Sequence, residues 1–72
     1  MTWNYRIMKH EEKGQVYYQI HEAFYDDLEQ EATSWAGPIE PGAETVEGLK
    51  ADLDLMLQAF QYPVLEPKQV PQ

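Results

Sequence analysis

Imidazole and carboxylate side chains cluster at one place in the sequence, where His21-Glu22 is followed by Asp26-Asp27. Such groups together can hold a divalent cation. Successive residues of a strand point to opposite faces of its sheet, however, so His21 and Glu22 cannot readily share one ion. A solvated strand end accounts for the cluster better, and we expect neither a metal nor another cofactor.

Proton-transfer chemistry has equally little support. His10 lies in a charged segment with no acid or base partner nearby in the sequence. General acid–base catalysis needs such a partner. Two carboxylate pairs are available, Glu40 with Glu44 and Asp52 with Asp54. Neither pair can act without a pocket that shifts its pKa. The chain has no glycine-rich phosphate loop, so we predict that it is not an enzyme.

The charge balance favours a protein partner over nucleic acid. The 72 residues carry a net charge of −8. Residues 1–13 hold three bases and two acids, so the acidic excess lies in residues 14–72. Nucleic-acid binding relies on Lys and Arg at phosphates, whereas an acidic surface attracts basic proteins. The alternative is that the acidity only keeps a small protein in solution.

Aromatic residues form a second group that could bind a ligand. They are Trp3, Tyr17, Tyr18, Tyr25 and Trp35. On a small sheet, such rings can stack on the bases of single-stranded nucleic acid. That arrangement needs interleaved cations, and only Arg6 and Lys9 are at hand. We therefore expect the rings to pack in the core and predict no nucleic-acid binding.

Alternating apolar and polar residues place these groups on strands. Residues 3–8 predict one strand and residues 16–25 a longer one. The polar residues 10–14 end in glycine and predict the loop of a hairpin. Residues 32–36 predict a short third strand. With a helix following, the sequence predicts an α+β fold, a three-stranded antiparallel meander with one amphipathic helix on one sheet face (β-β-β-α).

One domain over residues 1–65 accounts for these elements. The polar, proline-containing residues 66–72 predict a disordered tail. No stretch approaches the ~20 apolar residues of a membrane span, and the first residues lack the apolar run of a signal peptide. The chain has no cysteine, which excludes disulfides. We expect a cytoplasmic protein that does not bind membranes.

The helix predicted over Thr45–Phe60 is the most informative element. Thr45 is a good N-cap, and the proline in Tyr62-Pro63 ends the helix. Apolar residues recur at helical spacing and are expected to cover the sheet, with Leu57 flanking them: Val46, Leu49, Leu53, Met56 and Phe60.

The opposite face of this helix is unusually apolar for a surface. Its residues predict contact with a partner, since small side chains permit close approach: Gly48, Ala51, Asp52, Leu55 and Ala59. Two further arrangements of Leu55 are open as well. Val64 and Leu65 could fold back over it, or it could simply be exposed, as single surface leucines often are.

Three segments resemble known proteins, namely residues 3–7, 17–25 and 34–49. Through them, most of the chain is similar to a group of small uncharacterised bacterial proteins, a resemblance that implies no activity. The chain also resembles the HicB-type antitoxin domain, in which a hairpin and a third strand lead through a glycine-containing turn into an amphipathic helix. The matching residues are Gly42, Thr45, Glu47 and Leu49. This likeness implies a β-β-β-α fold that binds and occludes a small basic toxin.

Together, these observations predict a small acidic protein-interaction module of the antitoxin or inhibitor kind. Its partner would be a basic protein or a second copy of the chain in a homodimer. The alternative is a small ligand-binding or enzyme-accessory domain whose concave sheet face takes a metabolite or metal. No convergent polar residues mark a pocket, which favours the interaction module.

Overall fold

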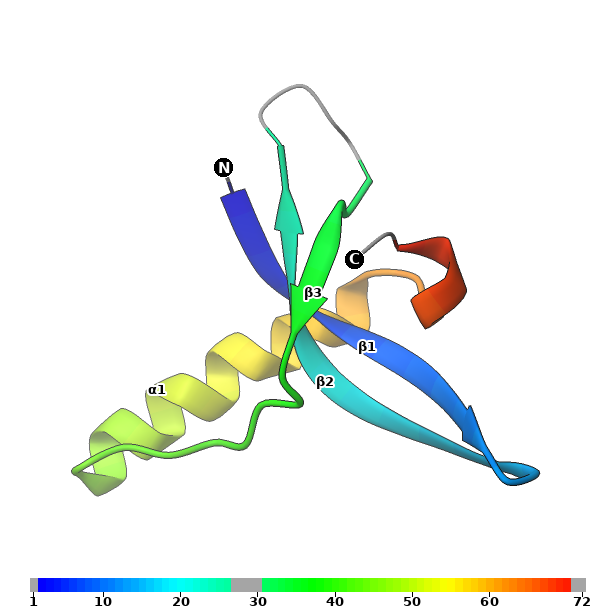
Figure 1. Ribbon diagram of the computed structural model, residues 1–72. Coiled ribbons are helices and arrows are strands. Elements are labelled where there is room, and N and C mark those ends of the chain that lie inside the picture. Colours follow the sequence, from blue (N-terminus) through cyan, green and yellow to red (C-terminus); the bar gives the residue numbers. More distant parts are fainter. Residues whose placement is uncertain (1, 27–30, 71–72) are drawn as a thin grey trace.

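A long β-hairpin is the framework of the protein in a computed structural model, which describes residues 2–26 and 31–70 (Figure 1). Strands β1 (Thr2–Glu12) and β2 (Gln15–Tyr25) pair antiparallel along their whole length. The short strand β3 (Ser34–Ala36) pairs with β2, so the sheet order is β1-β2-β3. The predicted three-stranded antiparallel meander is confirmed.

A tight turn joins the two long strands. Lys13 and Gly14 have positive φ angles of 52° and 79°. Two successive residues of this kind make the turn that best matches the twist of a hairpin. The loop predicted over residues 10–14 is therefore too long, because the strands continue to the turn itself. Lysine at the first turn position hides the usual Asn-Gly signal.

A helix follows the sheet, as predicted. Helix α1 (Val46–Leu57) begins after Thr45, whose Oγ1 accepts a hydrogen bond from the Gly48 N–H at 3.0 Å. A short 3-10 helix, η1 (Gln58–Gln61), continues α1. The predicted N-cap and the β-β-β-α order are confirmed. No helix within residues 2–26 and 31–70 is long and apolar enough to span a membrane.

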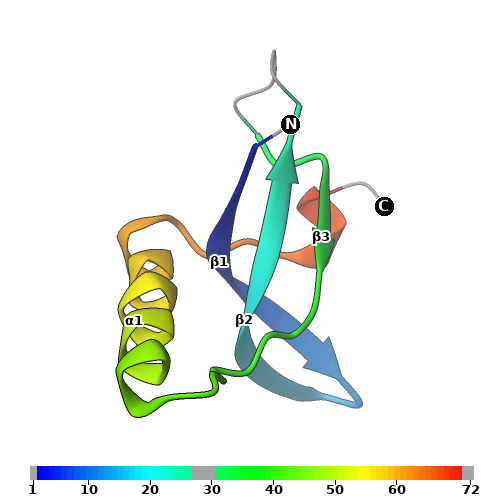
Figure 2. The same ribbon diagram turned by 90° about the vertical axis from the view of Figure 1, so that its left-hand side faces the viewer.

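Different segments cover the two faces of the hairpin (Figure 2). Ile7 and Ile20 are register partners on the face toward α1, where they line a hollow with Phe60 of η1. The opposite face carries Ala23, which has no exposed surface. Val70, beyond α1, packs against Ala23 there. The sheet therefore lies between α1 and the C-terminal segment.

The C-terminal segment also extends the sheet sideways. Leu65 forms a parallel bridge beside Met8. The Lys9 N–H donates to the Leu65 oxygen at 2.8 Å, and the Leu65 N–H donates to the Ile7 oxygen at 2.9 Å. These bonds fix the direction of the chain after α1.

A second 3-10 helix, η2 (Pro67–Gln69), then leads to Val70, which is 4% exposed. The tail predicted over residues 66–72 is thus wrong for residues 66–70, while residues 71–72 lie outside the described part. The prediction failed because the segment is polar on average, yet its fold depends on the single apolar side chains at its two ends, Leu65 and Val70.

The molecule is more open than its length suggests. Its radius of gyration is 13.1 Å, whereas about 11 Å is typical of 72 residues. The cause is visible in Figure 1, where α1 and the loop before it extend beyond the sheet. Helix α1 is anchored mainly through η1, which lies against β1.

Candidate protein interface

The apolar stripe that was expected to cover the sheet is exposed over most of its length. Of its predicted members, only Met56 is buried. The others, with the flanking leucine, form what we call the outer stripe: Val46, Leu49, Leu53, Leu57 and Phe60. Their exposed fractions run from 36% at Leu49 to 79% at Val46. The predicted stripe is therefore buried only at Met56, while Leu53, Leu57 and Phe60 line hollows on the side of the sheet and stay partly exposed.

Small and hydrogen-bonding residues occupy the inner side of the helix. Asp52 Oδ2 accepts a hydrogen bond from the Gly42 N–H at 3.0 Å, which ties the preceding loop to α1. A Cβ added to Gly48 would lie 3.1 Å from the Cβ of Ala43 in the same loop. Ala59 has no exposed surface, since η1 lies against β1 at this point. This close approach leaves the larger leucines on the outside.

The residues predicted to bind a partner do not share one accessible face. Leu55 is 46% exposed and Ala51 is also exposed. The remaining three are half-buried or buried: Gly48, Asp52 and Ala59.

The C-terminal residues do not cover Leu55 either, because Leu65 pairs with β1 and Val64 is 45% exposed. Of the three arrangements open for Leu55, coverage by the C-terminal residues does not occur, and the side chain is exposed in the single chain, as both a partner contact and a plain surface position require.

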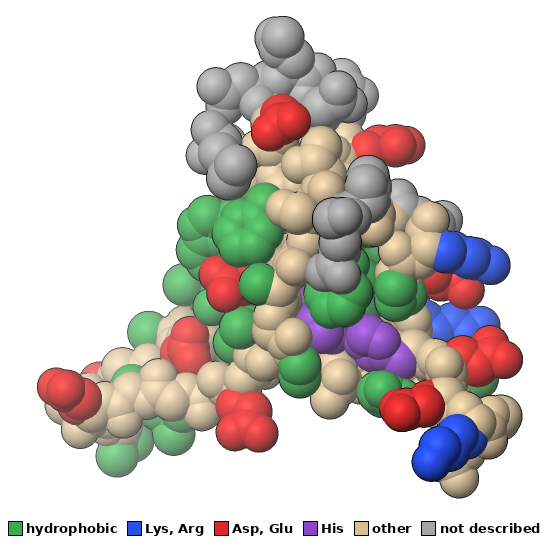
Figure 3. All heavy atoms as spheres, in the orientation of Figure 1, with side chains coloured by type: hydrophobic (Ala, Val, Ile, Leu, Met, Phe, Trp, Pro, Cys, Tyr) green, Lys and Arg blue, Asp and Glu red, His purple; other side chains and the backbone are tan. Residues whose placement is uncertain are grey.

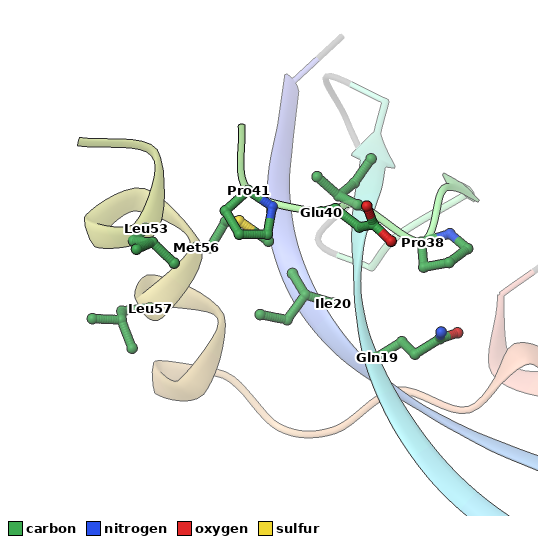
Figure 4. A pocket seen from close by; sticks show the side chains of 9 residues that line it. Gln19, Ile20, Pro38, Glu40, Pro41, Leu53, Met56 and Leu57 are labelled. Carbon is green, nitrogen blue, oxygen red and sulfur yellow. The ribbon is translucent and has the colours of Figure 1, made fainter. Parts of the chain in front are cut away.

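A groove runs between the outer stripe and the sheet. It consists of two hollows that share Gln19 and Ile20 of β2, one of about 340 Å³ and one of about 270 Å³. In Figure 4, Met56 and Ile20 lie between α1 and β2, while Leu53 and Leu57 lie across the hollow from Ile20. We call this feature the stripe groove.

Charged side chains lie at the edges of this surface, and one of them, Glu40, lines the stripe groove. Lys50 lies beside the outer stripe, and its Nζ is 3.1 Å from Asp54 Oδ2. Both side chains are well exposed, so their charges offset one another at the margin of the stripe. Figure 3 shows hydrophobic side chains at the surface of the projecting arm that α1 and its loop form.

The sequence did not reveal a histidine pair on the opposite sheet face. The Nε2 atoms of His10 and His21 are 2.8 Å apart, and His21 Nδ1 is 3.1 Å from the Ala36 oxygen. Figure 3 shows both imidazoles, in purple, side by side. Burial lowers the pKa of His21, the hydrogen bond to Ala36 opposes this, and the nearby His10 lowers the pKa further. His10 therefore has a partner, which only the hairpin register brings near it.

This pair does not extend into a metal site. Among the described residues, no three His, Cys, Asp or Glu side chains gather in a way that could hold an ion. His21 stands opposite Arg6 and Glu22 opposite Tyr5, so the two side chains take opposite faces. Asp27, also in the sequence cluster, lies outside the described residues.

A further hollow of about 450 Å³ lies beside Arg6 and the C-terminal segment. Arg6 is 8% exposed and its guanidinium is already engaged. Nη1 donates to the Tyr25 hydroxyl at 2.8 Å and Nη2 donates to the Pro63 oxygen at 2.7 Å. The ring of Tyr62 lies 5.2 Å from the guanidinium carbon. Arg6 thus holds the C-terminal segment on the sheet through its two terminal nitrogens, whereas its buried Nε has no hydrogen-bond partner among the described residues.

The aromatic residues expected in the core are divided between core and surface. Trp3, Tyr17 and Tyr18 are exposed, with 58% of Tyr18 accessible. Trp35 and Tyr25 pack against the core around Ala23. The expectation failed for these three rings because they lie toward the two ends of the long hairpin, which extend beyond the segments that cover its middle.

Comparison with known proteins finds no family model, curated protein or solved structure that matches this chain. The outer stripe and the stripe groove are therefore interpreted from their own chemistry.

Proposed function

We propose that this chain is a small acidic protein-interaction module that binds a protein through the outer stripe and the stripe groove and catalyses no reaction of its own. The observation that carries the proposal is the exposure of five large apolar side chains, of which even the least exposed, Leu49, is 36% accessible. Single exposed leucines are common, but a continuous apolar patch marks a binding surface.

The driving force for such binding is burial of apolar surface. Each square ångström removed from water contributes about 25 cal/mol before the costs of association. The outer stripe provides side chains for a partner's cavity, and the adjoining groove provides a cavity for a partner's side chain. Interfaces with a well-packed apolar centre commonly depend on a few such anchors.

The acidic remainder of the surface supports an inhibitor-like or antitoxin-like form of this function. A net charge of −8 speeds encounter with basic proteins, an effect that salt screens. The apolar stripe would then supply the short-range contact, while the acidic surface would determine which proteins approach.

Affinity capture with matched variants tests the proposal. The tagged chain is compared with a variant carrying Leu53→Asp and Leu57→Asp, and with Leu55→Asp as the control. Leu55 has an exposure of 46%, close to the 43% of Leu53, but lies about 160° around the helix from Leu53. We expect the wild type and Leu55→Asp to retain a stoichiometric protein, the untagged chain included, that the double variant loses.

Circular dichroism of all three proteins verifies that the fold is kept. The same recovered proteins for all three baits would contradict a binding role for the outer stripe.

A further inference from the structure

We infer that a second copy of this chain occupies the outer stripe, with the two α1 helices antiparallel across a two-fold axis near Leu53. This inference rests on the proposed function, namely that the stripe binds protein, and it names the occupant.

The spacing of the stripe carries the first argument. From Val46 through Leu49, Leu53 and Leu57 to Phe60, the intervals are 3, 4, 4 and 3 residues. This series reads the same in both directions. In an antiparallel pair centred on Leu53, Val46 therefore meets Phe60 of the second copy and Leu49 meets Leu57. Every stripe residue finds an apolar partner, as a two-fold interface requires of a self-complementary surface.

The surface area provides the second argument. The chain exposes 5465 Å². A folded monomer of 8.4 kDa is expected to expose about 4,600 Å². The excess of roughly 850 Å² is close to the ~800 Å² that each partner buries in a stable interface. The surface area that the single chain exposes beyond the expectation for a monomer is thus about as large as the area that one partner buries in a stable interface.

The charged side chains at the margin of the outer stripe are compatible with a second copy of the chain in the antiparallel register. In the antiparallel register, Lys50 of one copy lies about two residues, or roughly 3 Å along the axis, from the position facing Asp54 of the second copy. The Lys50–Asp54 pairs, which join Nζ to Oδ2 at 3.1 Å within one chain, can then also attract across the interface.

Site-specific crosslinking tests the register. The chain has no cysteine, so Leu53→Cys introduces a single thiol. At the two-fold axis this thiol meets its own copy, and we expect most of the protein to form a disulfide dimer under mild oxidation. Leu55→Cys, equally accessible, is the control and should remain uncrosslinked at the same concentration.

Sedimentation equilibrium measures dimer formation without crosslinking. Over about 1 to 200 µM, we expect the wild type to be a dimer, with Leu55→Asp within threefold of its dissociation constant. Leu53→Asp brings two carboxylates together at the axis and should raise the constant by roughly 100-fold. Raising NaCl from about 50 to about 500 mM should tighten the dimer, because salt screens repulsion between two acidic copies.

The outcomes separate this inference from the proposed function. A wild type that stays monomeric at the highest concentration, or a dimer disrupted equally by both aspartates, overturns the inference. If a monomeric chain still captures another protein that Leu53→Asp loses, the proposed function stands with a different occupant. If the chain is monomeric and the variants capture the same proteins as the wild type, both fail.

Discussion

His10 Nε2 and His21 Nε2 lie 2.8 Å apart across the β1–β2 hairpin. The direction of this hydrogen bond follows from the second contact of His21, because its Nδ1 must carry the hydrogen that the Ala36 oxygen accepts. In the neutral pair, His10 Nε2 therefore donates to His21 Nε2. Protonation of His21 at Nε2 removes the acceptor of this bond, so the bond persists only if His10 changes tautomer, and protonation of both rings places hydrogens on both facing nitrogens.

We predict from this pair that acid destabilises the fold. The pKa of His21 is lowered by burial, so the unfolded chain takes up a proton more readily than the folded one. Its contribution to stability is complete above the unfolded pKa of about 6.5 and declines as the pH falls below it. Urea unfolding at about pH 7.5 and about pH 5.5, at fixed protein concentration, measures the decline. The substitution His21→Phe should remove this loss of stability at the lower pH. If the variant loses as much unfolding free energy between the two pH values as the wild type, other groups cause the effect.

The same substitution should destabilise the protein strongly at Ala59 of η1 and only slightly at Ala51 of α1. Ala59 has no exposed surface and Ala51 is exposed. Ala59→Asp buries an unpaired charge and should cost at least about 3 kcal/mol of unfolding free energy, whereas Ala51→Asp should stay within about 0.5 kcal/mol. Thermal and urea unfolding compare the two. Equal small effects would show that η1 does not pack on β1 as described.

Asp52 should influence the pKa of Tyr5 through its charge, and the loop around Gly42 through a hydrogen bond. The pKa of Tyr5 is raised by burial first, and then by the charges of Asp52 and Glu22. Asp52→Asn removes the charge but keeps an acceptor for the Gly42 N–H, so it should lower the Tyr5 pKa with little loss of stability. Asp52→Ala should lower the pKa similarly and also cost about 0.5–1.5 kcal/mol.

A tyrosine-resolved NMR titration and urea unfolding provide the two measurements for Asp52. A Tyr5 pKa that is the same in all three proteins would place Asp52 too far from the ring to act on it.

Val70 tests the order of the C-terminal segment. Its side chain is 4% exposed against Ala23 and Ala32, so Val70→Ala removes two buried methyl groups and should cost roughly 1–3 kcal/mol. Val64→Ala is the matched control, because Val64 is 45% exposed, and should cost less than about 0.5 kcal/mol. Indistinguishable unfolding curves for the two variants would support the disordered tail that the composition suggests.

The order of the elements could be predicted from the sequence because each depends on local signals. Alternation specifies the strands, and Thr45 specifies the start of the helix through a bond within its own first turn. The orientation of the helix could not be predicted in this way. Periodicity shows that α1 has an apolar stripe, but the covered side depends on the Asp52–Gly42 bond and on the contact of Ala59 with the sheet.

The predicted partner-binding residues are divided between exposed and covered positions for the same reason. Small residues and one leucine on the less apolar side suggested a second contact, on the assumption that the main stripe was already buried. The histidine pair and the Leu65 bridge were missed because they join residues distant in the sequence, and their geometry follows only from the exact register of the hairpin.

Leu65 and Ile39 occupy backbone groups on the two outer edges of the hairpin. Leu65 bonds to the edge of β1, and the Ile39 N–H donates to the Ile20 oxygen on the edge of β2 at 3.0 Å. An incoming strand from another molecule would therefore find each row of amides interrupted near its middle. Because open strand edges are what allow sheets to polymerise, the two crossing segments protect the hairpin against edge-to-edge pairing with another molecule.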